Sequence, residues 1–448
     1  MKPTGATPLR RLLALACDIQ PREVSATLTS FLLVLILMGA YYLLRPLRDA
    51  MASNWTDAEV SWLWTFTFAF SVIAVSLYGA AVTRVRFHYL VPGVYGFFAA
   101  TFVLFYLGAT ALPDADTLDK AFYVWISVFS LFHISVFWSF MADTFSKSQS
   151  KRLFGFIGAG ASVGAIAGPA VVTFLAGSAG TEPLLLVAAV MLVLTLPVIG
   201  LLQRLKATAL HNEETQADAG DIARIGGNPL AGYVVFFQRN SGFLWGIGLF
   251  IFLYTAISSF VYFELKNLLA HYDEARRAQI WAAMDLVVNT LTIVIAAFAT
   301  GRIAKHLGLP FTLAMVPVAI CAGMLLLAAA PMVSIVVAVQ VARRAGNYAI
   351  SRPAREMLFT AVDRETRFKA KPVIDIVIYR GGDMLNAWGF TALTQGLGLG
   401  MAAVAGVGAA IAALWAAVGI YLGRRFNAMR PDIEATSQPE SVAADPAP

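Results

Sequence analysis

Long apolar stretches alternate with short polar ones along nearly the whole chain. A helix that crosses a bilayer needs about 20 consecutive, mostly apolar residues. The stretches that meet this requirement are 26–46, 60–82, 89–112, 121–142, 153–177, 183–203, 241–263, 279–300, 310–329, 332–352, 372–395 and 399–423. The pattern therefore predicts an all-α polytopic membrane protein with about 12 transmembrane helices.

One long polar segment, 204–240, separates the sixth span from the seventh, so we expect two six-helix halves. The last residues are rich in Pro, Ala, Ser and acidic side chains, a composition typical of disorder. The predicted organisation is a cytoplasmic N-terminal segment 1–25, an N-terminal six-helix bundle 26–203, a cytoplasmic linker 204–240, a C-terminal six-helix bundle 241–424 and a disordered cytoplasmic tail 425–448.

Composition and charge agree with a membrane protein and give its orientation. Hydrophobic residues make up 58% of the chain and charged residues 13%, against about 25% charged in ordinary soluble domains. The loops that are cytoplasmic when both termini are inside hold 17 Lys and Arg, and the opposite loops hold 5. Basic residues favour the cytoplasmic side, so the net charge of +6 indicates orientation and not nucleic-acid binding.

The motifs favour packing and transport over catalysis. Cys17 and Cys321 have no neighbouring Cys or His at metal-ligand spacing, and the chain contains no GxxxxGK[ST] phosphate loop. We therefore expect no metal, no cofactor, no ATP hydrolysis and no enzyme. The series Gly160-x-x-x-Gly164-x-x-x-Gly168 predicts a smooth helix face for close packing. Aromatic residues near span ends, including Trp64 and Tyr123, are interpreted as interface anchors.

Arg45, Arg48 and Asp49 close the first span, where a spanning helix usually ends in neutral residues. A charge at membrane depth is costly unless it is paired, wetted or able to reach the surface. One interpretation is that both arginines extend to the lipid headgroups. The other is that Pro46 bends the helix end inward, Arg48 lines an outer vestibule and Asp49 acts as a gate or ion-pair partner.

Span 11 places Arg380 and Asp383 close to mid-depth and three residues apart, hence on one helix face. Gly381 and Gly382 stand between them and are expected to loosen the helix, as in the discontinuous helices of transporter sites. The alternative is a buried ion pair that only holds helices together. Under either interpretation, the pair faces protein or water.

Span 10 carries Arg343, Arg344 and Asn347 near mid-depth, with Arg343 and Asn347 on one face. Adjacent residues point about 100° apart, so one arginine is expected to serve the substrate route or an interhelical pair. The other could reach the cytoplasmic interface.

Three further polar side chains lie at membrane depth. Asp285 in span 8 is a candidate proton or cation carrier, or the partner of an arginine in span 10. Glu264, at the end of span 7, could pair with a cation or carry a coupling proton. His133 in span 4 is either a proton relay or a hydrogen-bonded packing residue.

A weak internal repeat links the two halves. The segment 41–45 in span 1 is similar to 261–266 in span 7, and basic loops follow the matching spans of each half. Parallel repeats of this kind are typical of major facilitator transporters, whose substrate sites lie near the membrane midplane.

Several stretches together resemble the plastid and bacterial ATP/ADP translocases. The similarity rests on the segment Arg45-Pro46-Leu47-Arg48-Asp49, on 137–143, 151–154 and 158–161, and on Tyr348 with 353–357, 363–367, 369–371 and 374–377. The resemblance implies a major facilitator fold and nucleotide exchange without hydrolysis. Arg48 stands where that family carries a lysine, and Asp383 lies near the place of another.

The leading hypothesis is a secondary transporter for an anionic solute, such as a nucleotide or other phosphorylated metabolite. The substrate-binding candidates are Arg45, Arg48, Arg343, Asn347 and Arg380, and the coupling or gating candidates are Asp49, His133, Glu264, Asp285 and Asp383. Two alternatives are a proton-coupled exporter of neutral or amphipathic molecules and a membrane scaffold or sensor that does not transport. We expect a monomer in a bacterial inner membrane, with the lipid bilayer and a small anion as partners.

Overall fold

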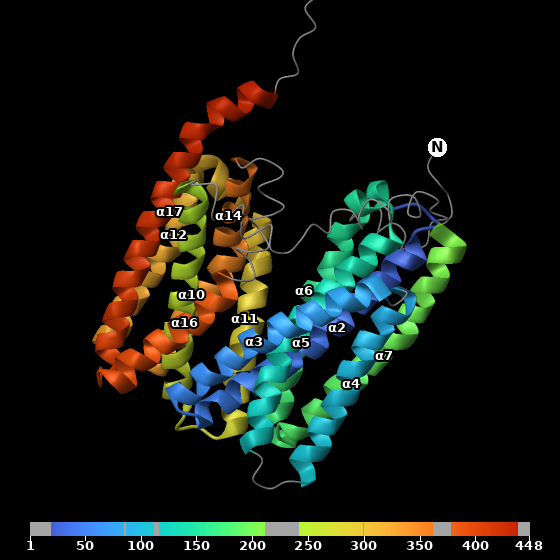
Figure 1. The fold of residues 1–448 in the computed structure, drawn as a ribbon, viewed down its shortest axis with the longest axis horizontal. Coiled ribbons are helices and arrows are strands. Elements are labelled where there is room, and N and C mark those ends of the chain that lie inside the picture. The colour runs from blue at the N-terminus through green and yellow to red at the C-terminus, as the bar shows by residue number, and fades with distance from the viewer. Residues whose placement is uncertain are drawn as a thin grey trace, which may run out of the picture. The chain divides into compact units, whose positions relative to one another are not determined.

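The structure, a computed structural model, describes residues 19–84, 87–111, 116–210, 242–298, 300–361 and 378–437. Within these ranges the regular elements are helices, which confirms the predicted fold class (Figure 1). The longer helices are α2 (Val24–Met51), α3 (Asp57–Arg84), α4 (Phe87–Ala111), α5 (Asp116–Thr144), α6 (Lys147–Ala179), α7 (Glu182–Leu205), α10 (Gly242–Leu269), α11 (Glu274–Phe298), α12 (Thr300–Ala329), α13 (Val333–Gly346), α16 (Tyr379–Thr391) and α17 (Met401–Ser437). The shorter ones are η1 (Ala52–Asn54), η2 (Lys206–Leu210), η3 (Asn347–Ser351), α14 (Arg352–Leu358), η4 (Phe359–Ala361) and η6 (Ala392–Gly396).

Among the described residues, 9 helices are long and apolar enough to cross a membrane. Helices α3, α13 and α16 are the members of the predicted set of twelve spans that fall outside this group. Helix α13 stops after 14 residues because the π-helix η3 interrupts the regular hydrogen bonding. The expected span 372–395 begins in residues outside the described ranges. Its described part contains α16, which runs from Tyr379 to Thr391.

The chain separates into two compact units. The first comprises Met1–Gly227 and Lys266–Thr290, and the second Asn228–Leu265 and Leu291–Pro448. The first unit thus contains α2 to α7, the end of α10 and most of α11. The second contains the rest of α10 and the helices from α12 to α17.

Helix α2 is the centre of the first unit and packs against α5, α6 and α7. Its buried face includes Leu33, Leu37 and Leu44, all with 0% exposure. The predicted glycine face of α6 lies against α2. A Cβ atom at Gly160 would stand 2.6 Å from the carbonyl oxygen of Phe31. The prediction of close helix packing along this glycine series is confirmed.

In the second unit α12 packs along α17, and α10 also contacts α17. A Cβ at Gly246 of α10 would lie 2.8 Å from Leu422. The rings of Phe260 in α10 and Phe390 in α16 are 5.3 Å apart and meet edge to face. These contacts build an apolar core between α10, α12, α16 and α17.

Two helix ends differ from the predicted boundaries. Helix α2 runs through Pro46 to Met51, so the proline does not bend the helix end into a separate segment. The preceding turn accommodates the proline ring inside a long helix that tertiary packing stabilises. Helix α17 continues past Arg425, where the sequence suggested a disordered tail, to Ser437.

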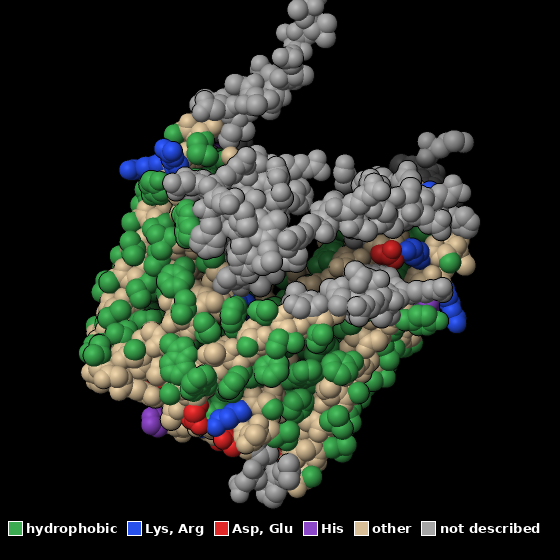
Figure 2. Space-filling model, viewed as in Figure 1, with side chains coloured by type: hydrophobic (Ala, Val, Ile, Leu, Met, Phe, Trp, Pro, Cys, Tyr) green, Lys and Arg blue, Asp and Glu red, His purple; other side chains and the backbone are tan. Residues whose placement is uncertain are grey.

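On the face drawn in Figure 2, hydrophobic side chains cover large parts of the described surface. Large hydrophobic side chains are strongly exposed, among them Phe174 at 75%, Leu77 at 66% and Leu104 at 65%. Charged side chains in this view gather near the ends of the helices. Exposed apolar area on this scale is typical of helices that contact lipid.

Glu23, just before α2, forms a pH-sensitive contact with Arg152 of α6. The carboxylate is 1% exposed and accepts a hydrogen bond of 2.9 Å from Arg152 Nη2. Burial raises the pKa of Glu23, but the bonds from Arg152 and from the Gln20 amide outweigh it and hold that pKa below 4.5. A carboxyl group whose pKa is lower in the folded protein than in the unfolded chain stabilises the fold at pH values above the unfolded pKa. This contribution is lost as the pH falls through the folded pKa.

We therefore expect the unfolding temperature of the wild type to exceed that of Glu23→Gln at pH 7. The difference should shrink as pH falls below about 4.5, because protonation of Glu23 removes its charge. Thermal unfolding of both proteins across this pH range checks the prediction. A difference that does not change with pH would contradict it.

Candidate functional site

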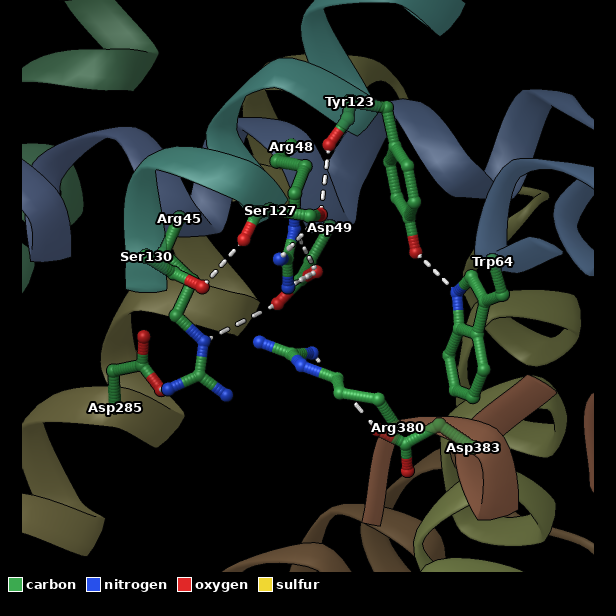
Figure 3. Close-up of polar contacts among 10 residues, drawn as sticks. All are labelled: Arg45, Arg48, Asp49, Trp64, Tyr123, Ser127, Ser130, Asp285, Arg380 and Asp383. Carbon is green, nitrogen blue, oxygen red and sulfur yellow. Dashed lines mark hydrogen bonds and ion pairs between the residues drawn. The ribbon is translucent and has the colours of Figure 1, made fainter. Parts of the chain in front are cut away.

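Arg45, Arg48 and Asp49 form an ion cluster near the C-terminal end of α2 (Figure 3). Asp49 is only 2% exposed and accepts a hydrogen bond of 2.9 Å from Arg48 Nε. The Arg45 Nε lies 3.7 Å from the same carboxylate, one helical turn away. Asp49 is therefore an ion-pair partner of both arginines, as one of the two interpretations expected.

Side chains from two other helices complete this cluster. Arg45 Nη1 lies 3.7 Å from Asp285 of α11, and Arg48 Nη1 donates to Ser127 of α5 at 3.2 Å. The two arginine side chains are 16% and 14% exposed. The headgroup interpretation is therefore wrong, because both guanidinium groups contact carboxylates inside the first unit.

Asp285 was expected either to carry an ion or to pair with an arginine of span 10. In the structure its ion-pair partner is Arg45, from the first span. Asn289, one turn further along α11, donates to the carbonyl oxygen of Ala165 at 2.7 Å. The polar face of α11 thus contacts α2 and α6, which the sequence could not indicate. Two arginines and two aspartates leave this cluster close to electrical neutrality.

His133 is a packing residue in this structure. It is 4% exposed, its Nδ1 lies 2.9 Å from the carbonyl oxygen of Ser130, and its ring stacks on Tyr41 at 4.3 Å. These contacts agree with the hydrogen-bonded packing role that was one of the two predicted possibilities.

Arg343 of α13 is the most distinctive charged residue of the second unit. It is 4% exposed. Its Nε donates to Gln340 at 3.0 Å and its Nη1 donates to the Tyr254 hydroxyl at 3.1 Å. The guanidinium also lies over the Tyr254 ring, 5.6 Å from its centre. Among the described residues its hydrogen-bond partners are neutral, and no carboxylate pairs with it.

The neighbours of Arg343 in span 10 differ from expectation. Arg344 is 1% exposed, so it does not reach the cytoplasmic interface. Asn347 is half-buried at the first position of η3, where the π-helix begins. π-helical turns are frequent at functional sites because they change which side chains share a face.

Arg380 and Asp383 lie on one face of α16, with 3.9 Å between Nη1 and the carboxylate (Figure 3). Their side chains are 27% and 19% exposed. Gly381 and Gly382 do not break the helix, so that expectation is wrong. Gly382 instead permits close packing, since a Cβ there would stand 2.5 Å from Thr255 Oγ1.

Glu264 lies near the end of α10 and is 1% exposed. Both of its carboxylate oxygens are buried and have no hydrogen-bond partner among the described residues. It does not pair with a cation there, which was one of its two expected roles.

Sequence patterns missed two tyrosines beside the arginines. Tyr123 is 2% exposed, lies 5.3 Å under the Arg48 guanidinium and accepts a hydrogen bond of 2.7 Å from Trp64. Its interpretation as an interface anchor is therefore wrong. Tyr254 contacts Arg343 across 89 residues of sequence. A tyrosine within an apolar span is the only signal available, and it does not identify the partner.

Comparison with known proteins identifies the fold. The model of the Major Facilitator Superfamily matches residues 30–351. The structure resembles the inward-open xylose transporter XylE from E. coli, with a TM-score of 0.60, 13% identity and coverage of 93% of this chain and 100% of that one.

Two other solved structures resemble the chain to a similar degree. A bacterial homologue of the human lysosomal transporter Spinster has a TM-score of 0.57, 11% identity and coverage of 95% and 100%. The nucleoside transporter NupG has a TM-score of 0.57, 12% identity and coverage of 92% and 99%. A search of curated proteins found no match. The family match spans well over half of the chain, which therefore belongs to the major facilitator superfamily of membrane transporters and is not an enzyme.

Proposed function

We propose that this protein is a secondary transporter for an anionic solute and that Arg343 binds the anion. The observation that carries the proposal is the neutral coordination of a buried guanidinium. Burying a cation without a counter-charge is expensive, and helices rarely keep one at membrane depth without a function. A bound anion would supply a counter-charge in direct contact with the guanidinium.

The geometry around Arg343 suits oxyanions. A guanidinium presents five N–H donors in a planar fork, which matches the oxygens of phosphate and carboxylate groups. Gln340 and Tyr254 each occupy one nitrogen, on Nε and Nη1. Within the described part of the chain, these are the hydrogen bonds of the guanidinium, which leaves donors for a ligand. Arg380, whose side chain is 27% exposed, is a second candidate for contact with the substrate.

The substrate class rests on the resemblance to ATP/ADP translocases. It supports a nucleotide or another phosphorylated metabolite, and ATP/ADP exchange is its most specific form. Transport would follow alternating access, as in other transporters built from parallel repeats. We place the protein in a bacterial inner membrane and expect it to act as a monomer.

Uptake into proteoliposomes tests the proposal. The labelled solutes should include ATP, ADP, a phosphorylated sugar and a dicarboxylate. We expect Arg343→Gln to reduce uptake of the accepted anion about 10- to 100-fold, because a hydrogen bond to a charged group contributes about 1.5–3 kcal/mol. Arg343→Lys should restore part of the activity through its charge.

Arg276 provides the matched control, since it is exposed and lies in the first turn of α11. Arg276→Gln should transport like the wild type. A thermal-shift screen against the same solutes gives an independent readout, because a ligand stabilises in proportion to its occupancy. The proposal fails if the wild type neither binds nor transports any anion, or if Arg343→Gln behaves like the wild type. Uptake of neutral molecules alone would favour the exporter alternative.

A further inference from the structure

Glu264 differs from the other acidic residues of the transmembrane helices considered above. Asp285 has Arg45 as a partner at 3.7 Å, and Asp383 has Arg380 at 3.9 Å. Glu264 is 1% exposed, and both of its oxygens lack a hydrogen-bond partner within the described part of the chain. Among the described residues it is therefore a buried acid with neither a counter-charge nor a hydrogen-bond donor.

The direction in which Glu264 points follows from its position on α10. With 3.6 residues per turn, Glu264 lies on the same face as Gly246, which contacts Leu422 of α17. One turn earlier, Phe260 contacts Phe390 of α16 and lies 3.6 Å from a Cβ built at Gly408 of α17. Glu264 consequently faces the apolar core of the second unit.

In the described parts of α12, α16 and α17, no unpaired charge lies at this level. Helix α17 contains no ionisable acid or base from Met401 to Gly423 except the phenol of Tyr421, and α12 contains none from Leu307 to Ala329 except the thiol of Cys321. The charged residues of α16 are Arg380 and Asp383, which pair with each other about two turns from Phe390. On α10 itself, Lys266 is bound to Asp57 at 2.8 Å.

An ionised carboxylate in such surroundings would lose its hydration without compensation. The cost of burying an unpaired charge is so large that a group usually neutralises instead. The uncharged carboxylic acid is thus the form that fits this environment. If the second unit opened to water, the carboxylate could be hydrated, and the ionised form would no longer be unfavourable.

We propose that Glu264 is a proton-binding site that couples proton movement to the transport cycle. In the closed state the carboxyl group holds its proton. When water reaches it, the O–H bond breaks, the proton passes to water and the carboxylate remains. Reburial requires that a proton from water bind again. The coupling to an anion rests on the function proposed above, whereas the proton-binding site itself does not.

Infrared spectroscopy of the purified protein tests the site without any substrate. The C=O stretch of a protonated carboxyl group is separate from the bands of carboxylates. At neutral pH the wild type should show such a band, and its intensity should be lower in Glu264→Gln by the contribution of one carboxyl group. Asp285→Asn is the matched control and should keep the band, because Asp285 is paired with an arginine. Absence of the band, or a band of equal intensity in the wild type and Glu264→Gln, overturns the proposal.

A transport assay tests the coupling. Uptake of the accepted anion should respond to an imposed pH gradient in the wild type, and this response should disappear in Glu264→Gln, which mimics the protonated acid. An unchanged response in the variant overturns the coupling. If the wild type moves no anion, the proposed function fails, and the infrared result still decides whether Glu264 binds a proton.

Discussion

Replacing Gly164 by leucine is expected to prevent α2 and α6 from packing together. A Cβ atom at this position would overlap the carbonyl oxygen of Leu35 and stand 2.9 Å from the amide nitrogen of Gly39. These obstacles are backbone atoms, so no side-chain rotation can relieve them. Overpacking usually costs about 1–3 kcal/mol, and a clash with backbone atoms should reach or exceed the upper end. Detergent-extracted Gly164→Leu should give little folded, monodisperse protein.

The matched control lies on the same helix. Gly155 is exposed, and a Cβ built there meets nothing within 4 Å. Gly155→Leu should therefore be produced at wild-type yield and unfold within a few degrees of the wild type. Equal yields of the Gly164 and Gly155 variants would show that the helices do not approach as closely as the structure indicates.

Replacing Asp57 by alanine should also destabilise the protein strongly. Lys266 Nζ lies 2.8 Å from Asp57, and the two side chains are 1% and 8% exposed. The same Nζ donates to the carbonyl oxygen of Trp55 at 3.0 Å. Removing one member of a buried pair costs about 3–5 kcal/mol, because the other charge is left buried alone. The midpoint of thermal or denaturant unfolding measures this loss.

Two further variants separate this explanation from a general loss of packing. The double variant Asp57→Ala/Lys266→Met should regain much of the lost stability, since no charge remains uncompensated. Asp143→Ala removes a pair with Lys206 whose side chains are 41% and 32% exposed, and it should cost no more than about 1 kcal/mol. An Asp57 variant as stable as the Asp143 variant would contradict the prediction.

The periodicity and spacing of residues were sufficient to predict structural features that depend on residues close together in the sequence. The apolar stretches gave the helices, because each span must satisfy its own backbone in the membrane. The Gly160–Gly164–Gly168 spacing gave the close face of α6, since residues four apart share a face. The ion pairs of Asp49 with Arg45 and of Arg380 with Asp383 follow from the same rule.

Contacts between distant segments could not be derived in this way. Asp285 pairs with Arg45 across 240 positions of sequence, and Arg343 meets Tyr254 through the packing of α13 on α10. Each contact depends on how the helices rotate about their axes when the core forms. The continuity of α16 through two glycines is another example, because packing on Thr255 fixes a segment that is weak by local propensity.

The neutral coordination of Arg343 has an electrical consequence. Moving one elementary charge through the full membrane potential changes the energy by about 2.3 kcal/mol per 100 mV. If Arg343 binds the anion as proposed, the second unit with an empty site would carry the charge of this guanidinium through part of that field, whereas a bound monoanion would cancel it. The membrane potential would then affect the conformational change of the unloaded transporter and would have little effect on that of the loaded transporter. In an energised cell, the interior-negative potential would hold the vacant site turned toward the cytoplasm.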